Sequence, residues 1–291
     1  MNLLSNLIWL VACILGTAEA ANTAKITSYS DLVTNEGTIT MGLYGDAAPL
    51  TTQNYLQYVK YNLYPGTIIH RLDPSFVFQG GGYNIYGQPI QTFAPIIDEA
   101  ATSKLSNLQG TVAMARNKDP NSATSQFFFN LTDNSAGLDY GSTKNPDGSA
   151  ADGYAVFATV VAGNSVVNEI GLLTPYGQKG GPPIIPTGQL VQIAGAFAYS
   201  LDEATIPKFR VITNGTGTGT VKSSPGGVCK ISPCTYKVKS GQKVNLTATP
   251  ATGSYFVGWS GDCLSGDRTT SVISSKETPS STSCVATFDA K

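Results

Sequence analysis

The residues best suited to chemistry lie in three segments of the 291-residue chain, 69–81, 110–116 and 121–130. Arg71 and Gln79 stand there among aliphatic and phenylalanine side chains. Arginine keeps its charge at physiological pH and presents a rigid fork of N–H donors. Taken alone, Arg71 would be interpreted as a surface or ion-paired residue. The dense motifs around it favour a functional role, in which a fixed donor stabilises charge that develops during a reaction.

Other reaction classes find little support in the sequence. His70 is the single histidine, so no second histidine exists for a Ser/His/Asp set, and we expect His70 itself to be packed rather than catalytic. The glycine run 80–82 is interpreted as a turn, because it lacks the G-x-G-x-x-G spacing of a dinucleotide site. No pair of carboxylates stands in a recognisable frame. Hydrolase and redox functions are therefore not favoured.

The three segments, in this order and spacing, resemble the cyclophilins, and the resemblance covers about residues 25–200. It implies peptidyl-prolyl cis–trans isomerase (rotamase) activity. It also implies a mainly β fold, a closed eight-stranded antiparallel barrel capped by two helices.

Carried over residue by residue, the resemblance makes Arg71 the catalytic arginine and Gln79 its polar neighbour. Eight further positions match the substrate-binding wall: Phe76, Val77, Ala115, Arg116, Gln126, Phe128, Leu138 and Tyr154. The chain departs from the family around residues 134–139, where the usual aromatic before Leu138 is missing. That aromatic contacts cyclosporin in the family, so its absence argues against tight binding of the drug.

The chemistry suits these residues. Rotation about an X–Pro bond breaks amide resonance against a barrier of roughly 18–20 kcal/mol. In the twisted state the prolyl nitrogen gains a lone pair, which a donor such as Arg71 stabilises more than either planar state. No bond is cleaved, so no metal, cofactor or nucleophile is required.

The elements that must position these residues are mostly strands. Short β-type segments include 37–44, 67–71, 76–78, 110–115, 126–129 and 154–161, parted by Gly, Pro, Asn and Asp. Two helices are predicted, at 50–61 with Thr51 or Thr52 as its cap, and at 164–173. Alternation along 127–129 assigns Phe127 and Phe129 to the core and Phe128 to the pocket.

A second domain is expected at the C-terminus, because four of the five cysteines lie in the last quarter of the chain. Their clustering favours two disulfides over a metal site, with three pairings open. Alternating segments without a helix pattern predict a small all-β sandwich. This region resembles bacterial repeat modules of exported and surface proteins. The resemblance implies Cys229–Cys234 and Cys263–Cys284 disulfides and no defined ligand, and Trp259 is expected in the core.

The predicted organisation is a signal peptide at 1–20, an isomerase domain at 21–200, a linker at 201–207 and the β-domain at 208–291. Residues 1–15 are almost wholly apolar, and Ala18-Glu19-Ala20 has the form of a signal peptidase site. The competing interpretation is a lipid anchor at Cys13. We expect an exported protein, periplasmic or secreted.

The charge is divided unequally between the two domains. Residues 21–207 carry 8 basic and 14 acidic side chains, whereas residues 208–291 carry 10 and 4. This asymmetry predicts either different partners or two domains that attract each other. The expected partners are proline-containing polypeptides and, through the basic domain, an anionic envelope surface, with no nucleic acid. The alternative function is a proline-segment binder or chaperone, or a surface-tethering protein, without important catalysis.

Overall fold

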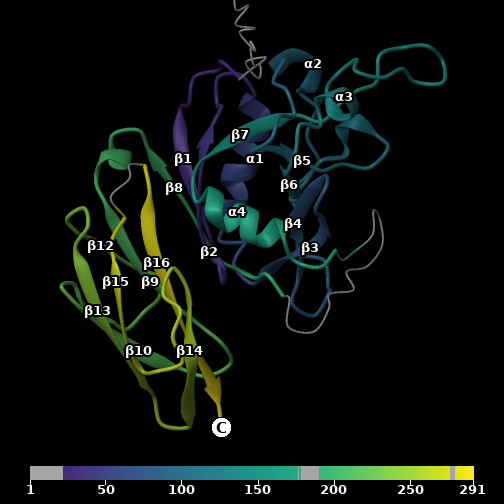
Figure 1. The fold of residues 1–291 in the computed structure, drawn as a ribbon. Helices are drawn as coiled ribbons and strands as arrows, with labels where there is room; N and C mark the ends of the chain where they lie inside the picture. The colour runs from purple at the N-terminus through teal and green to yellow at the C-terminus, as the bar shows by residue number, and fades with distance from the viewer. Residues whose placement is uncertain (1–21, 176, 178–189, 276–278) are drawn as a thin grey trace, which may run out of the picture.

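The computed structural model describes residues 22–175, 177, 190–275 and 279–291, which form two β-rich domains. The predicted signal peptide, Cys13 included, lies outside the described residues. Figure 1 shows the first domain in purple to teal and the second in green to yellow. No helix within the described ranges has the length and apolar character needed to cross a membrane.

The first domain is built on one strongly curled antiparallel sheet. Its order is β3-β4-β6-β5-β7-β2-β1-β8. The strands are β1 (Ser28–Thr34), β2 (Gly37–Leu43), β3 (Thr67–Asp73), β4 (Val77–Asn84), β5 (Thr111–Met114), β6 (Phe127–Asn130), β7 (Val156–Ala162) and β8 (Ile193–Ser200).

The prediction of a closed barrel was wrong. The sheet has β3 and β8 as its two edges. They meet through only a few backbone contacts at the start of β8, among them the isolated bridge between Ile68 and Gln192 and the hydrogen bond from Ile69 N to Val191 O at 2.9 Å. The sheet is therefore a curled half-barrel whose edges touch, because β8 runs on from Ile193 away from β3 to pair with β1.

Two helices cover the core that the curled sheet encloses. They are α1 (Pro49–Lys60) and α4 (Asn164–Gly171), close to the predicted ranges. The short helices α2 (Ala100–Ser103) and α3 (Ser135–Leu138) and the 3-10 turns η1 (Pro120–Ser122) and η2 (Glu203–Thr205) lie in the connections. Tyr55 and Tyr58 of α1 and Ile170 of α4 are buried in the same cluster as Phe127 and Phe129 of β6.

The predicted cap of α1 was wrong. Thr51 and Thr52 lie inside the helix, whose N-terminal residue is Pro49. The free N–H groups are instead satisfied by Glu99, a residue from a distant connection. Its carboxylate accepts hydrogen bonds from Leu50 N at 3.1 Å and from Thr51 N and Oγ1 at 2.7 Å each. A buried carboxylate at a helix N-terminus also suits the helix dipole.

The second domain is a sandwich of two four-stranded sheets, in the orders β11-β10-β13-β15 and β12-β9-β16-β14. Its strands are β9 (Lys208–Asn214), β10 (Gly219–Ser224), β11 (Gly227–Cys229), β12 (Cys234–Lys237), β13 (Lys243–Pro250), β14 (Ser254–Gly261), β15 (Thr269–Ile273) and β16 (Ser281–Ala290). Cys229–Cys234 and Cys263–Cys284 lie at disulfide distance, with Cα atoms 5.7 and 5.1 Å apart. Trp259 packs in the core beside the second pair, as expected.

A buried ion pair fastens the two domains together. Asp31 of β1 is fully buried, and its Oδ2 lies 2.6 Å from Nη1 of Arg210 on β9. The same carboxylate accepts hydrogen bonds from Thr40 at 2.7 Å, Tyr199 at 3.0 Å and Ser281 at 2.8 Å. Every lone-pair direction of the buried carboxylate therefore has a donor, which a buried ion pair requires.

A second carboxylate bridges the same interface in the opposite direction. Asp262 of the β-domain accepts hydrogen bonds from Thr38 N and Oγ1 on β2, at 3.0 and 2.8 Å. Gly261 N donates to Asn35 O at 3.1 Å. Between the two carboxylates lies a small apolar cluster that joins β1 and β8 to β9 and β16: Val33, Ala194, Phe197, Ile212 and Val285. Polar and apolar contacts thus join the two domains.

The buried pair yields a test of this interface. Replacing Arg210→Met leaves Asp31 buried without its counter-ion, so we expect the free energy of unfolding to fall by about 3 kcal/mol. Urea titration of the full chain with disulfides intact measures it. Lys222→Met, an exposed cation of the same domain, serves as control and should change the value by less than about 0.5 kcal/mol. Equal stabilities of the two variants would contradict a stabilising interface.

Candidate active site

The alternation of side chains along β6 separates the main core from a second apolar cluster. Phe127 and Phe129 are fully buried inside the curled sheet, as predicted, and Phe128 points to its outer face. There Phe128 joins Val77 in a second apolar cluster. Six of the predicted substrate-binding residues meet in this cluster: Phe76, Val77, Ala115, Phe128, Leu138 and Tyr154. The Tyr154 ring meets Phe128 edge-on, with centroids 5.7 Å apart.

Arg71 and Gln79 face each other at the border of this cluster. They are cross-strand partners on β3 and β4. The guanidinium of Arg71 is half-buried and lies 5.6 Å from the centre of the Phe76 ring. Within the described part of the chain, it makes no hydrogen bond or ion pair that would occupy its donors. Gln79 does not hold Arg71, because its Nε2 donates to Gln126 Oε1 at 2.7 Å. The arrangement offers an available cationic donor beside an apolar wall.

Glycines let β4 pass close to the neighbouring strands. The run 80–82 was predicted as a turn, but it continues β4 up to Asn84. A Cβ on Gly82 would lie 2.6 Å from the Gln126 side chain. Gly81 has φ of +78°, and its Cβ would meet Phe127 at 2.8 Å. The glycines therefore serve an irregular strand pairing and the close approach of Gln126 rather than a chain reversal.

His70 takes no part in the site's chemistry. Its imidazole is buried and packs edge-on against Tyr83, with centroids 4.8 Å apart. Burial lowers the pKa of His70 to about 4. The ring is consequently neutral near pH 7, in agreement with the packed role expected from the sequence.

Arg116 lies near the cluster but differs from Arg71 in its contacts. Its Nε and Nη2 donate to Gly153 O at 3.0 and 2.6 Å, and its Nη1 donates to Asn117 O at 3.0 Å. Its guanidinium also lies 4.4 Å from the centre of the Tyr154 ring. Three N–H groups of the Arg116 guanidinium are thus engaged within the protein.

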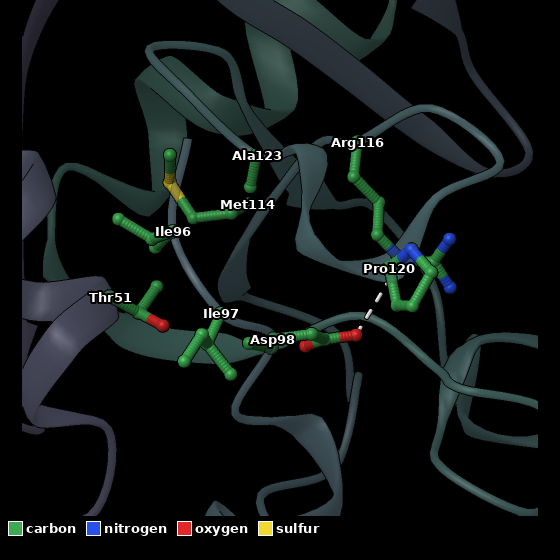
Figure 2. Close-up of a pocket in the computed structure, with 9 residues that line it drawn as sticks. Thr51, Ile96, Ile97, Asp98, Met114, Arg116, Pro120 and Ala123 are labelled. Carbon is green, nitrogen blue, oxygen red and sulfur yellow. Dashed lines mark ion pairs between the residues drawn. The ribbon is translucent and has the colours of Figure 1, made fainter. Parts of the chain in front are cut away.

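Asp98 is the site residue that sequence reasoning missed. It forms an ion pair with Arg116 across a small hollow, with 3.6 Å between Asp98 Oδ2 and Arg116 Nε (Figure 2). The hollow is lined by Thr51, Ile96, Ile97, Asp98, Met114, Arg116, Pro120, Ala123 and Ala155. No signal in the sequence pairs these two residues, because Asp98 precedes α2 in one connection and Arg116 follows β5 in another.

A hydrogen-bond network holds Leu138 in the outer apolar cluster. Asp139, which follows it, accepts hydrogen bonds from Asn107 N at 2.7 Å and from Asn107 Nδ2 at 3.0 Å. Tyr154 N donates to Leu138 O at 2.9 Å. Leu138 and Tyr154 are therefore fixed to each other through the backbone, although 15 residues of chain separate them.

Comparison with known proteins agrees with this geometry. The profile of the family described as "Cyclophilin type peptidyl-prolyl cis-trans isomerase/CLD" matches residues 29–185. A peptidyl-prolyl cis-trans isomerase of Acinetobacter baylyi is 41% identical over 160 residues, which are 55% of this chain and 80% of the relative. Isomerase B of Escherichia coli is 42% identical over 139 residues, 47% of this chain and 80% of the relative. The isomerase cyp18 of Streptomyces antibioticus is 46% identical over 140 residues, 48% and 81% of the two chains.

The second domain has its own match, since residues 218–291 fit the profile described as "Divergent InlB B-repeat domain". Together with the half-barrel, the outer apolar cluster and the arginine at its border, these matches assign the first domain. The chain belongs to the cyclophilin family of peptidyl-prolyl cis–trans isomerases.

Proposed function

We propose that this isomerase acts on X–Pro bonds of exported proteins and that Arg71 provides the main stabilisation of the twisted amide. The observation that carries the proposal is the pairing of an unengaged guanidinium with an apolar wall. Arg71 stands 5.6 Å from Phe76, and its donors are free among the described residues. A donor held in place before the reaction needs no reorganisation when the prolyl nitrogen gains its lone pair.

The apolar cluster supports the second half of the mechanism. Phe76, Val77, Phe128, Leu138 and Tyr154 provide a surface for the proline ring that excludes water. In such surroundings the polar ground state of the planar amide loses hydration, and the contact with Arg71 strengthens. Gln79 Nε2 donates one hydrogen to Gln126 Oε1 at 2.7 Å, and its second N–H is a donor for a substrate carbonyl.

Features near both ends of the chain support a location in an oxidising compartment. The apolar residues 1–15 and the Ala18-Glu19-Ala20 pattern indicate export. The pairs Cys229–Cys234 and Cys263–Cys284, at disulfide distance, support the same conclusion, because disulfides persist mainly outside the cytosol. The proposed clients are therefore periplasmic or secreted polypeptides that contain proline.

Removal of the Arg71 guanidinium tests the mechanism. We expect Arg71→Ala to lower the catalysed exchange rate of an X–Pro tetrapeptide by about 100-fold or more, as loss of a main charge-stabilising donor does. Exchange NMR at equal enzyme concentrations measures it, and a chemical-shift titration of the same peptide should show affinity within a few-fold of wild type. Lys60→Ala, an exposed cation on α1, is the control. Full exchange by Arg71→Ala would remove Arg71 from the mechanism, and slow exchange by the wild type would leave a proline-segment binder.

For the second domain, we propose attachment to an anionic envelope surface. The sheet β11-β10-β13-β15 lies opposite the sheet that contacts the first domain, and its four strands contain two lysines and no acidic residue. Lys222 of β10 and Lys243 of β13 are exposed on its outer face, while Val244 and Leu246 face the sandwich core. Lysines near an anionic surface contribute about 1 kcal/mol each.

Charge reversal on that face tests the attachment. The full chain with Lys222→Glu and Lys243→Glu should bind isolated cell envelopes at least about tenfold more weakly, and wild-type binding should fall as salt rises. A matched control, Lys60→Glu with Lys104→Glu, changes the net charge equally on the first domain and should bind as wild type does. Binding that is insensitive to salt, or equal loss in both variants, would rule out this face.

A further inference from the structure

The two arginines beside the apolar cluster are in different states. No described residue accepts a hydrogen bond from Arg71, whereas Arg116 donates from Nε and Nη2 to Gly153 O and from Nη1 to Asn117 O. Only 11% of the Arg116 side chain is exposed. Since a guanidinium has no acceptor and a fixed planar fork, these contacts also fix the plane in which Arg116 lies. Arg116 is therefore held in one orientation beside the apolar cluster.

The acceptor of Arg116 is itself fixed. Gly153 has φ of +73°, and a Cβ there would come within 2.5 Å of Tyr140 N. Only glycine tolerates that backbone and that approach. The stretch that precedes Gly153 folds back on itself, since Gly141 N donates to Ala151 O at 2.9 Å. Arg116, which follows Ala115 of the cluster, thus holds the end of this hairpin directly before Tyr154.

The guanidinium of Arg116 lies against the ring of Tyr154. The guanidinium carbon is 4.4 Å from the centre of the Tyr154 ring, close enough for a cation–π contact. The ring meets Phe128 edge-on at 5.7 Å. Tyr154 is therefore held between Arg116 and Phe128, and its orientation decides the shape of the pocket that receives the proline ring.

Asp98 completes the arrangement from the opposite side of the hollow (Figure 2). Its side chain is 9% exposed, and its Oδ1 accepts a hydrogen bond from Ala100 N at 3.0 Å. Its Oδ2 has no hydrogen-bond donor among the described residues and faces Arg116 Nε at 3.6 Å. Because Arg116 is the cation with which this buried carboxylate forms an ion pair, the carboxylate helps to hold the guanidinium in place.

We infer that Asp98 and Arg116 are positioning residues of the isomerase, which set the affinity for the prolyl substrate by fixing Tyr154 against Phe128. This inference rests on the isomerase activity of the family and not on the role proposed for Arg71. It also changes the role of Arg116, from a peptide contact to a support for the pocket wall. A wall contacts the proline ring in the planar and the twisted states alike, so its loss weakens binding of both.

The kinetic signature of this role is a change in KM. For Arg116→Lys, which keeps the charge but loses the planar fork, we expect KM to rise about three- to fivefold and kcat to stay within about twofold. Asp98→Asn keeps the shape and removes the charge, and it should shift KM in the same direction. Exchange NMR over a range of peptide concentrations gives both constants. Lys118→Gln, an exposed cation two residues beyond Arg116, is the control for charge and should match the wild type.

The pH dependence provides an independent readout. Burial raises the pKa of the Asp98 carboxyl, the charges of Asp152 and Glu99 raise it further, and the Ala100 N–H and Arg116 oppose the rise. Protonation removes the anion that places Arg116, so the wild-type KM should rise as the pH is lowered from neutral toward the raised pKa of Asp98. Asp98→Asn should show a raised KM that does not change across this interval.

Three results would overturn the inference. Unchanged KM in both variants, with only a lower melting temperature, would make the pair structural alone. A KM shift that depends on the charge of the residues flanking proline in two test peptides would restore Arg116 as a direct peptide contact. Tyr154 ring resonances that stay unchanged in Arg116→Lys and Asp98→Asn would show that the pair does not place the ring.

Discussion

One curled sheet with alternating side chains is the constraint on which the rest of the first domain depends. Successive residues of a strand point to opposite faces, so Phe127 and Phe129 enter the core while Phe128 faces outward. The core residues fix the position of β6, and β6 in turn fixes the pocket. The same strands therefore supply the core on one face and a second apolar cluster on the other, and a change of register by one residue would exchange the two.

Three arginines of this chain show how the surroundings decide what a guanidinium does. Arg210 is buried against Asp31 and holds the two domains together. Arg116 is engaged by backbone carbonyls and Asp98, and it supports Tyr154. Arg71 is half-buried, with donors that no described residue occupies. The side chain is chemically the same in each case. The acceptors within reach therefore distinguish the buried Arg210 and Arg116 from Arg71, for which we propose a catalytic role.

The second domain docks away from the outer apolar cluster. Its contacts reach β1, β2 and β8, which stand together at one end of the sheet order. The residues of the outer apolar cluster belong to β4, β6 and the segments that follow β5 and precede β7. These elements lie toward the other end of the sheet order. The β-domain thus stabilises the isomerase domain from the side and faces outward with its own lysine-bearing sheet. The two modules are joined here by one buried ion pair, a second buried carboxylate and an apolar cluster.

The sequence by itself determined the family, the mainly β class, both long helices within a few residues, and the alternation of Phe127, Phe128 and Phe129. These features follow from the local periodicity of apolar side chains and from motifs that are contiguous in the chain. It did not determine the edge contacts of β3 and β8, the Glu99 cap of α1, the strand conformation of the glycine run 80–82, or the pairing of Asp98 with Arg116. Each of these depends on a partner distant in the sequence, and only the tertiary structure brings the partners to within hydrogen-bonding distance and removes the water between them.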